Sequence, residues 1–221
     1  MIETSKIKRR WWPWFLAGLT LVAASFLFDN RVDAALDASR DPAWHKVAWW
    51  CSKLGEGWVP AAMGLFFVAA FFLAGRPVVA ARIFFAVLTC ELTGLAVLIL
   101  RLFFGRTRPS NHDVPPGFYG FWHDGHWIAG QFKFSSFPSG HAATAVGLAA
   151  AAWLVHRGWG ALLAVYAVAV MWSRLALQAH HLSDVLASAV LAITLAVWMK
   201  PFLLTSIEFQ FGNLHRAWEK H

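Results

Sequence analysis

Six apolar segments constrain this chain more than any other feature of its sequence. They cover residues 11–28, 58–74, 78–104, 139–155, 159–177 and 182–204. Each is long enough to cross the ~30 Å hydrocarbon layer of a bilayer as an α-helix, with some tilt. The composition agrees, since 58% of the 221 residues are hydrophobic and only 14% are charged. The sequence therefore predicts an all-α, six-transmembrane-helix bundle that forms a single integral-membrane domain over residues 1–221.

The first apolar segment follows a basic stretch, Lys6-Ile-Lys8-Arg9-Arg10. A basic start before an apolar run is also the pattern of a secretory signal peptide. This run is long for a signal peptide and lacks a clear small-x-small cleavage site, so we interpret it as an uncleaved first span. Because basic residues beside a span favour the cytoplasmic side, we expect the N-terminus to lie in the cytoplasm.

Two segments between the apolar runs have patterns of their own. Asp41 and Pro42 suit the N-cap and the first position of a helix, and apolar residues recur at three- and four-residue steps up to Gly55. The tryptophans of this segment predict an interfacial helix at the membrane surface. Residues 105–138, between the third and fourth spans, form the longest irregular stretch, and its aromatic residues predict an ordered outer loop.

Several residue types exclude other classes of protein. His123-Asp124-Gly-His126 in the long loop could in principle bind a metal, but the sequence offers no supporting set of ligands, so we predict no metal and no other cofactor. Cys51 and Cys90 cannot make a disulfide framework, and we interpret both as structural. The net charge of +7 comes without a nucleic-acid-binding motif, so we expect no nucleic-acid partner.

One polar stretch, Ser173–Asp184, interrupts the apolar sequence with an arginine, two histidines and an aspartate. Charges at the ends of spans are costly and indicate a functional site, although a membrane boundary in contact with water is the alternative. A neutral imidazole is a good nucleophile towards phosphorus, and a carboxylate four residues later on a helix can hold its other nitrogen. Helical geometry leaves the nucleophile open, because Asp184 is four residues from His180 and three from His181.

Alternating span directions bring distant polar residues to one face of the membrane. The exit of the third span and the entry of the fourth lie on the same side as the exit of the fifth and the entry of the sixth. This face should gather seven polar residues: Arg101, Arg108, Ser139, His141, Arg174, His180 and Asp184. A cytoplasmic N-terminus would make it the outer face. Glu91 should lie about 15 Å deeper than Arg101, and we expect it to be a buried hydrogen-bond partner of another helix.

The chemistry that these residues share is phosphate binding. Arginine guanidinium groups match phosphate oxygens in two-pronged geometry. Pro138-Ser139-Gly140-His141 opens a helix, and the backbone N–H groups and positive dipole end of such a helix can hold an anion. Because phosphoryl transfer depends mainly on positioning and charge stabilisation, arginines can replace magnesium in it.

Three motifs in this order resemble those of the type 2 phosphatidic acid phosphatases, within the acid phosphatase and vanadium haloperoxidase superfamily. They are Arg101-x6-Arg108-Pro109, Pro138-Ser139-Gly140-His141 and Ser173-Arg174-x5-His180-x3-Asp184. The six spans match the membrane architecture of that family, so the resemblance covers nearly the whole chain. Two departures stand out: Arg101 replaces the usual lysine, and Gln178 stands where many relatives have glycine, which would crowd the loop before His180.

The resemblance implies a metal-independent membrane phosphatase with defined residue roles. The motif spacing selects His180 as the nucleophile that forms a phosphohistidine, with Asp184 orienting it. His141 would protonate the leaving alkoxide and then activate water. The phosphate-binding groups implied are Arg101, Arg108, Ser139, the Gly140 amide and Arg174.

We therefore predict a lipid phosphatase of the bacterial inner membrane, which hydrolyses a lipid phosphate or pyrophosphate at the outer, periplasmic face. A lipid phosphotransferase using the same intermediate is the alternative enzyme, whereas haloperoxidases are mostly soluble. A transporter would instead distribute its charges along a path at several depths. The sequence leaves open the oligomeric state and the head group: undecaprenyl pyrophosphate, phosphatidylglycerol phosphate, phosphatidic acid or a lipid A phosphate.

Overall fold

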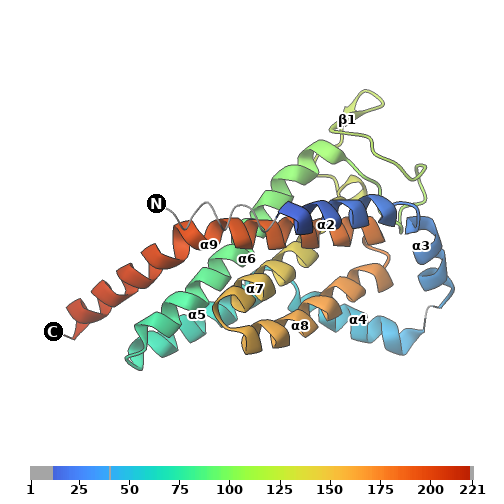
Figure 1. Ribbon diagram of the computed structural model, residues 1–221. Helices are drawn as coiled ribbons and strands as arrows, with labels where there is room; N and C mark the ends of the chain where they lie inside the picture. The colour runs from blue at the N-terminus through green and yellow to red at the C-terminus, as the bar shows by residue number, and fades with distance from the viewer. Residues whose placement is uncertain (1–11, 40, 220–221) are drawn as a thin grey trace.

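The computed structural model describes residues 12–39 and 41–219, so the basic stretch Lys6–Arg10 lies outside the described residues. The described part is helical, with one small hairpin in the long loop (Figure 1). Its elements are α2 (Trp12–Ser25), α3 (Asp29–Ala38), α4 (Pro42–Leu54), α5 (Trp58–Leu73), α6 (Pro77–Phe104), β1 (Trp122–His123), β2 (His126–Trp127), the 3-10 turn η1 (Phe132–Phe134), α7 (Gly140–Val155), α8 (Arg157–Ala176) and α9 (Leu182–Trp218).

Helix α7 is the centre of the bundle and packs against α6, α8 and α9 (Figure 1). Small residues permit this close packing, since α7 buries seven alanines or glycines along its length. A Cβ atom added at Gly147 would lie 2.5 Å from Thr93 Oγ1 of α6. Thr93 Oγ1 also donates a hydrogen bond to the Ala143 carbonyl, at 3.0 Å. These contacts fix the first half of α7 against the middle of α6.

The apolar helices identify an integral membrane protein with three to five candidate spans among the described residues. Within residues 12–39 and 41–219, three helices, α6, α8 and α9, are long and apolar enough to cross a membrane. The pair α2–α3 is bent by 60° and the pair α4–α5 by 51°, and counting each pair as one broken span gives up to five. Helix α7 is apolar but shorter. The count of six and the interfacial position of α4 therefore stay predictions.

Helix α4 has the start that its sequence predicts, and α3 was not predicted. Asp41 caps α4 by accepting hydrogen bonds from the amides of Ala43 and Trp44. Helix α3 is short, with little apolar character, and its carboxylates rather than an apolar stripe fix its position, through contacts described below.

The last helix continues beyond the predicted end at residue 204, although Pro201 was expected from the sequence to interrupt it. Helix α9 passes through Pro201 and ends at Trp218. Its second half packs on α5 and α6: Phe211 lies against Phe72 and Phe84, and Glu208 pairs with Arg82 at 2.9 Å. These tertiary contacts outweigh the single backbone hydrogen bond that proline removes.

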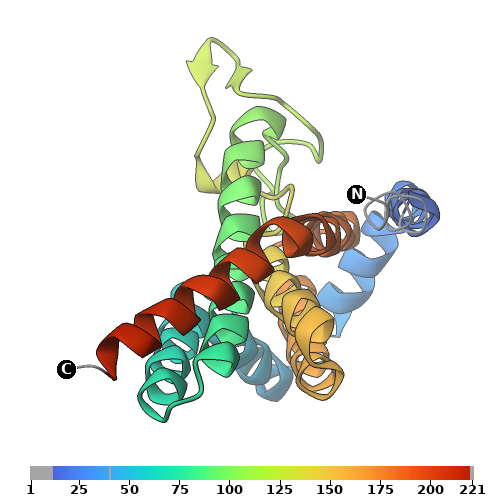
Figure 2. The same ribbon diagram turned by 60° about the vertical axis from the view of Figure 1, so that its left-hand side comes forward.

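The long segment between α6 and α7 is ordered and projects beyond the helices (Figure 2). Aromatic contacts hold its base, where Phe137 packs against Phe104 and Phe118. Its tip is the hairpin of β1 and β2, in which Trp122 pairs with Trp127. The two ends of this segment carry the first and second motifs, so its order fixes both.

Candidate active site

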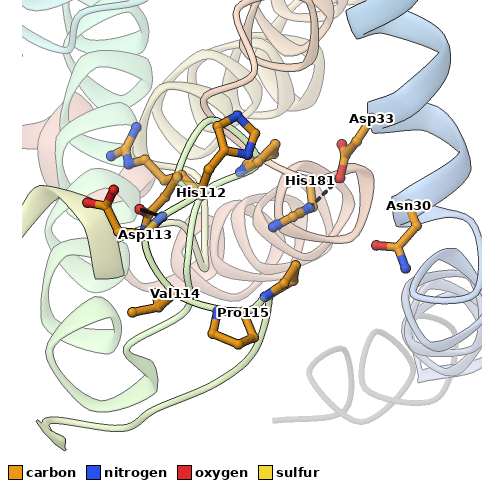
Figure 3. A pocket seen from close by; sticks show the side chains of 11 residues that line it. Asn30, Asp33, His112, Asp113, Val114, Pro115 and His181 are labelled. Atoms are coloured by element: carbon orange, nitrogen blue, oxygen red, sulfur yellow. Dashed lines mark hydrogen bonds and ion pairs between the residues drawn. The ribbon is translucent and has the colours of Figure 1, made fainter. Parts of the chain in front are cut away.

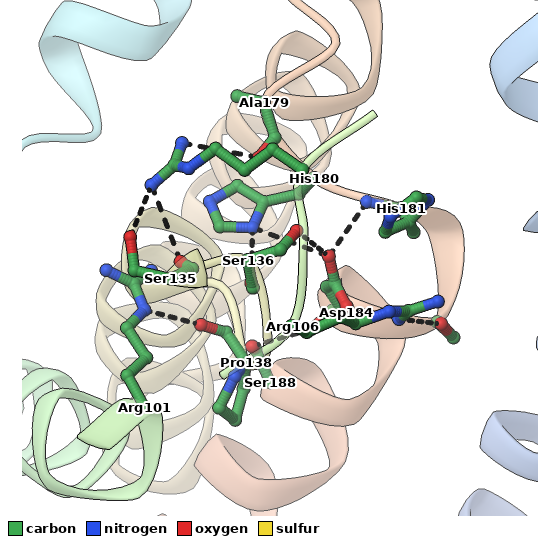
Figure 4. Close-up of polar contacts among 12 residues, drawn as sticks. Arg101, Arg106, Ser135, Ser136, Pro138, Ala179, His180, His181, Asp184 and Ser188 are labelled. Carbon is green, nitrogen blue, oxygen red and sulfur yellow. Dashed lines mark hydrogen bonds and ion pairs between the residues drawn. The ribbon is translucent and has the colours of Figure 1, made fainter. Parts of the chain in front are cut away.

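Three buried donor atoms without partners lie where the phosphate-binding motifs meet. Arg101 Nη2, Arg174 Nε and Ser139 Oγ have no hydrogen-bond partner among the described residues. The other contacts of the two arginines hold them in place: Arg101 Nε donates to the Pro138 carbonyl at 2.7 Å (Figure 4), and Arg174 Nη1 donates to Ser52 Oγ. Buried unsatisfied donors are costly, so this cluster suits an anion that would accept from all three.

The first turn of α7 adds backbone donors to this cluster. Ser139 occupies the N-cap position, but its side chain caps no amide of the helix. A Cβ atom at Gly140 would lie 3.1 Å from Arg101 Nη2, so glycine permits the guanidinium to approach the start of α7. The uncapped amides and the positive dipole end then face the same region as the arginines. The predicted association of Arg101, Ser139 and Gly140 is present in the structure.

Arg108 also belongs to the cluster, and backbone oxygens hold it. Its Nε donates to the Phe132 carbonyl at 2.8 Å and its Nη1 to the Ala179 carbonyl at 3.3 Å, while the guanidinium stacks on the Phe132 ring. Burial, together with the charges of Arg101 and Arg174, lowers the pKa of Arg108 to about 9. It therefore remains charged at neutral pH.

His180 presents one ring nitrogen that is free to act as a nucleophile. Its Nδ1 lies 2.6 Å from the Ser136 carbonyl, and because a carbonyl only accepts, Nδ1 must carry the proton. The lone pair then belongs to Nε2, which has no hydrogen-bond partner among the described residues. Burial lowers the pKa of His180 to about 3, against the opposing effect of Asp184, so the ring is neutral at neutral pH.

The expected helical pairing of His180 with Asp184 is wrong in detail. His180 precedes α9, which begins at Leu182, so the two residues do not share a helix face. Nδ1 of His180 lies 3.6 Å from Asp184 Oδ2, too far for a hydrogen bond but close enough for electrostatic attraction. Ser136 links the two, since its carbonyl accepts from His180 and its hydroxyl donates to Asp184 (Figure 4).

His181 differs from its neighbour because both of its ring nitrogens face acceptors. Nδ1 lies 2.6 Å from Asp33 Oδ2, and Nε2 lies 3.1 Å from the Thr107 carbonyl. Burial disfavours the charged ring, but the hydrogen bond to Asp33 and the charge of Asp184 outweigh it and raise the pKa of His181. With both nitrogens donating, His181 has no lone pair for attack, which favours His180.

Arg106 is a buried member of the site that our reading of the sequence missed, although it lies within the first motif. Its guanidinium lies beside Asp184 (Figure 4) and pairs with Asp184 Oδ1. On its other side it pairs with Asp29 Oδ2 at 2.7 Å. It also lies 4.9 Å from the ring centroids of Phe26 and Phe118. Asp184 is thus held on one oxygen by Arg106 and on the other by the Ser136 hydroxyl and the His181 amide.

Helix α3 supplies two carboxylates to the network, both missed from the sequence. Asp29 Oδ1 accepts from the Ser183 amide at 2.9 Å, and so caps the start of α9. Asp33 holds His181, and the backbone carbonyl of Asp33 accepts from Gln178 Nε2 at 3.2 Å. The sequence held one signal for this pair: Asp29 and Asp33 are four residues apart, which places them on one face of a helix. Because acidic groups occupy the start of α9, the uncapped start of α7 is the better anion site.

Gln178 does not crowd the loop before His180, as its replacement of glycine had suggested. Its φ angle is +52°, in the left-handed region where glycine is favoured, and its side chain is buried towards α3. The hydrogen bond to Asp33 offsets part of the backbone strain.

His141 stands at the first turn of α7, half-buried, and no described residue hydrogen-bonds to its side chain. The charges of Arg174, Arg101 and Glu56 act on its ring. Glu56 lies at the corner between α4 and α5 and was not predicted. His141 therefore lies beside the cluster with a ring that can receive or give a proton.

Glu91 contradicts the expectation of a buried hydrogen-bond partner. It is exposed on α6 and its described hydrogen bond is with the neighbouring Cys90 Sγ, at 3.6 Å. A Cβ atom at Gly57 would lie 3.6 Å from its carboxylate, which places Glu91 beside the α4–α5 corner and outside the anion cluster.

An apolar helical bundle with a buried cluster of arginines and an available imidazole defines a membrane protein built to hold an anion. A family model described as the PAP2 superfamily matches residues 79–208, and the chain belongs to that superfamily. The resemblance inferred from the three motifs is therefore confirmed.

Two solved structures share the fold. Aquifex aeolicus LpxE is 23% identical with a TM-score of 0.57, covering 79% of this chain and 96% of its own. The first transmembrane PAP2 type phosphatidylglycerolphosphate phosphatase from Bacillus subtilis is 22% identical with a TM-score of 0.63, covering 85% of this chain and 92% of its own. None of the curated proteins matches the sequence significantly.

Proposed function

We propose that this member of the PAP2 superfamily is a metal-independent phosphatase that hydrolyses a lipid phosphate through a phosphohistidine on His180. One observation carries the proposal: the Ser136 carbonyl fixes the proton of His180 on Nδ1, which directs the Nε2 lone pair away from it. The buried donors of Arg101, Arg174 and Ser139 supply the charge and hydrogen bonds that a phosphoryl group requires.

In the first step, His180 Nε2 attacks phosphorus and the bond to the lipid oxygen breaks. The ring gains positive charge, and Asp184 Oδ2, 3.6 Å from Nδ1, stabilises it. His141 gives its proton to the leaving alkoxide. Burial opposes a charged His141 most, and the nearby arginines oppose it further. A bound phosphate dianion offsets the charge of the arginines, so substrate binding shifts His141 towards its acid form.

In the second step, water replaces the lipid alcohol. His141, now neutral, takes a proton from the water as its oxygen attacks phosphorus and the phosphorus–Nε2 bond breaks. Inorganic phosphate leaves, and His180 returns to its neutral form with the proton still on Nδ1. The arginines carry the charge of the phosphoryl group throughout, the part that magnesium plays in other phosphoryl-transfer enzymes.

The test is phosphate release by the purified protein across a panel of lipids: phosphatidylglycerol phosphate, phosphatidic acid, lipid A phosphate and undecaprenyl pyrophosphate. The similar protein from Bacillus subtilis is a phosphatidylglycerolphosphate phosphatase, which supports including the first of these substrates. Release of inorganic phosphate from at least one lipid supports hydrolysis. Transfer of phosphate to an added lipid alcohol without release would instead indicate the phosphotransferase.

A further inference from the structure

A hollow lies beside the anion cluster, between α3 and the loop that follows Arg108 (Figure 3). It has a volume of about 510 Å³. Two of its wall residues, Arg108 and His181, flank the proposed nucleophile, since Arg108 donates to the Ala179 carbonyl immediately before His180 and His181 follows it. A group bound here would therefore lie next to the phosphoryl group.

Two buried polar atoms of this cavity wall lack partners among the described residues: Asn111 Nδ2, a donor, and Asp33 Oδ1, an acceptor. The orientation of the Asn111 amide is fixed, because its oxygen accepts from the Asp113 amide at 3.2 Å. Asp33 uses its other oxygen to bind His181. A hydroxyl group both donates and accepts, so hydroxyls satisfy this pair of atoms.

The charges of the wall favour a neutral occupant. Asp33 is balanced by His181, whose pKa is raised, and Asp113 is balanced by Lys133. Arg108 directs its donors to the backbone oxygens beside the anion cluster. A second phosphate would bring only acceptors towards the carboxylates of Asp33 and Asp113, which like-charge repulsion disfavours.

We propose that this cavity binds the hydroxyl-bearing head group of the lipid phosphate, a glycerol or a sugar, and selects such monoesters over substrates without free hydroxyls. Asn111 and Asp33 are the residues that determine this preference. The proposal rests on the proposed phosphatase function, because the cavity is expected to hold the part of the substrate that carries the scissile phosphate.

The experiment compares kcat/KM for three substrates: phosphatidylglycerol phosphate, a lipid A 1-phosphate and phosphatidic acid, which has no free hydroxyl. Asn111→Asp keeps the oxygen that holds the turn and replaces the donor with an acceptor, while Asn111→Leu removes the donor without adding charge. Asn213→Ala, on the distant end of α9, is the matched control. We expect the ratio of the preferred hydroxyl-bearing substrate to phosphatidic acid to fall about tenfold in both Asn111 variants, as for the loss of one buried hydrogen bond.

Each outcome decides the proposal. If kcat/KM falls in the Asn111 variants selectively for the glycerol lipid or for the sugar lipid, the proposal is supported, and the affected substrate identifies the head group that the cavity binds. An unchanged ratio in both Asn111 variants, or an equal fall in the control, overturns the cavity proposal while phosphate release leaves the proposed function standing. If the wild-type protein releases phosphate from none of the lipids, the proposed function itself fails.

Discussion

Two adjacent histidines have different protonation patterns, which the sequence could not distinguish. His180 donates through Nδ1 to a carbonyl and keeps Nε2 free, whereas His181 donates through both nitrogens. The difference arises from Ser136 and Asp33, which lie 44 and 148 residues away in the sequence. Motif spacing selected His180, and the structure supports that choice with hydrogen-bond geometry.

Exchanging each histidine should separate their roles in catalysis. His180→Ala removes the attacking nitrogen, and phosphate release should fall by at least ~10³-fold, because water does not replace a positioned nucleophile. His181→Gln keeps a polar side chain beside Asp33 and should reduce the rate by only about tenfold. Steady-state phosphate release in detergent measures both. The reverse ranking would identify His181 as the nucleophile.

The two histidines also predict how stability depends on pH. The folded pKa of His181 is raised above its ordinary value of 6.5, so its contribution is full below pH 6.5 and is lost as pH rises through the folded pKa. The pKa of His180 is lowered from 6.5 to about 3, so stability is lost as pH falls from 6.5 towards 3. The unfolding temperature should therefore fall on both sides of pH 6.5.

The variant His181→Gln isolates one side of this profile. In this variant the unfolding temperature should fall less steeply above pH 6.5, and its fall below pH 6.5 should remain. The exposed His112 is the control position, and His112→Gln should change neither side. An alkaline slope that persists unchanged in His181→Gln would contradict a charged His181 in the folded protein.

At the scale of secondary structure, helix α3 is the element that the sequence did not reveal. It is only ten residues long and has little apolar character, so the pattern by which amphipathic helices are recognised is weak, and its carboxylates Asp29 and Asp33 make its contacts with the site. Through Arg106, Asp29 positions Asp184, and neither residue needs to touch the substrate. We expect Asp29 and Arg106 to act as positioning residues.

Replacing Asp29 tests this positioning role. Asp29→Asn preserves shape but removes the charge that holds Arg106, so Asp184 should shift and kcat should fall about 10- to 100-fold with little change in KM. Asp29→Glu, which restores the charge, should recover part of kcat. Glu208→Gln removes the exposed partner of Arg82 and serves as the control.

A purely structural role for Asp29 would give another result. The unfolding temperature would then fall while kcat, normalised to folded protein, remained at the wild-type value.

At the scale of the whole molecule, the local sequence predicted which residues gather at the site better than it predicted where the spans begin and end. The motif residues come together because each lies at the end of an apolar run, and those runs are visible in the sequence. Arg106, Ser136 and Asp29 were missed because the side chains to which they hydrogen-bond are 44 to 154 residues distant in the sequence. The continuation of α9 depends likewise on packing against α5 and α6, which no local pattern records.

The orientation of the site in the membrane is a further prediction for the whole molecule. Ser110 is exposed, two residues after Arg108. In a background with Cys51 replaced, a cysteine introduced by Ser110→Cys should react in intact cells with a membrane-impermeant thiol reagent. Reaction only after the membrane is broken would place the site on the cytoplasmic side.

The central claim is a covalent, metal-independent intermediate on His180, and rapid-quench trapping measures it directly. Purified protein is mixed with a lipid labelled in its phosphate in the presence of excess chelator, quenched at alkaline pH, and the modified peptide is located by mass spectrometry. We predict acid-labile phosphate on His180 in the wild-type protein and in His181→Gln, none in His180→Ala, and inhibition by vanadate. Phosphate on another residue, or turnover that stops in chelator and returns with magnesium, would contradict the account.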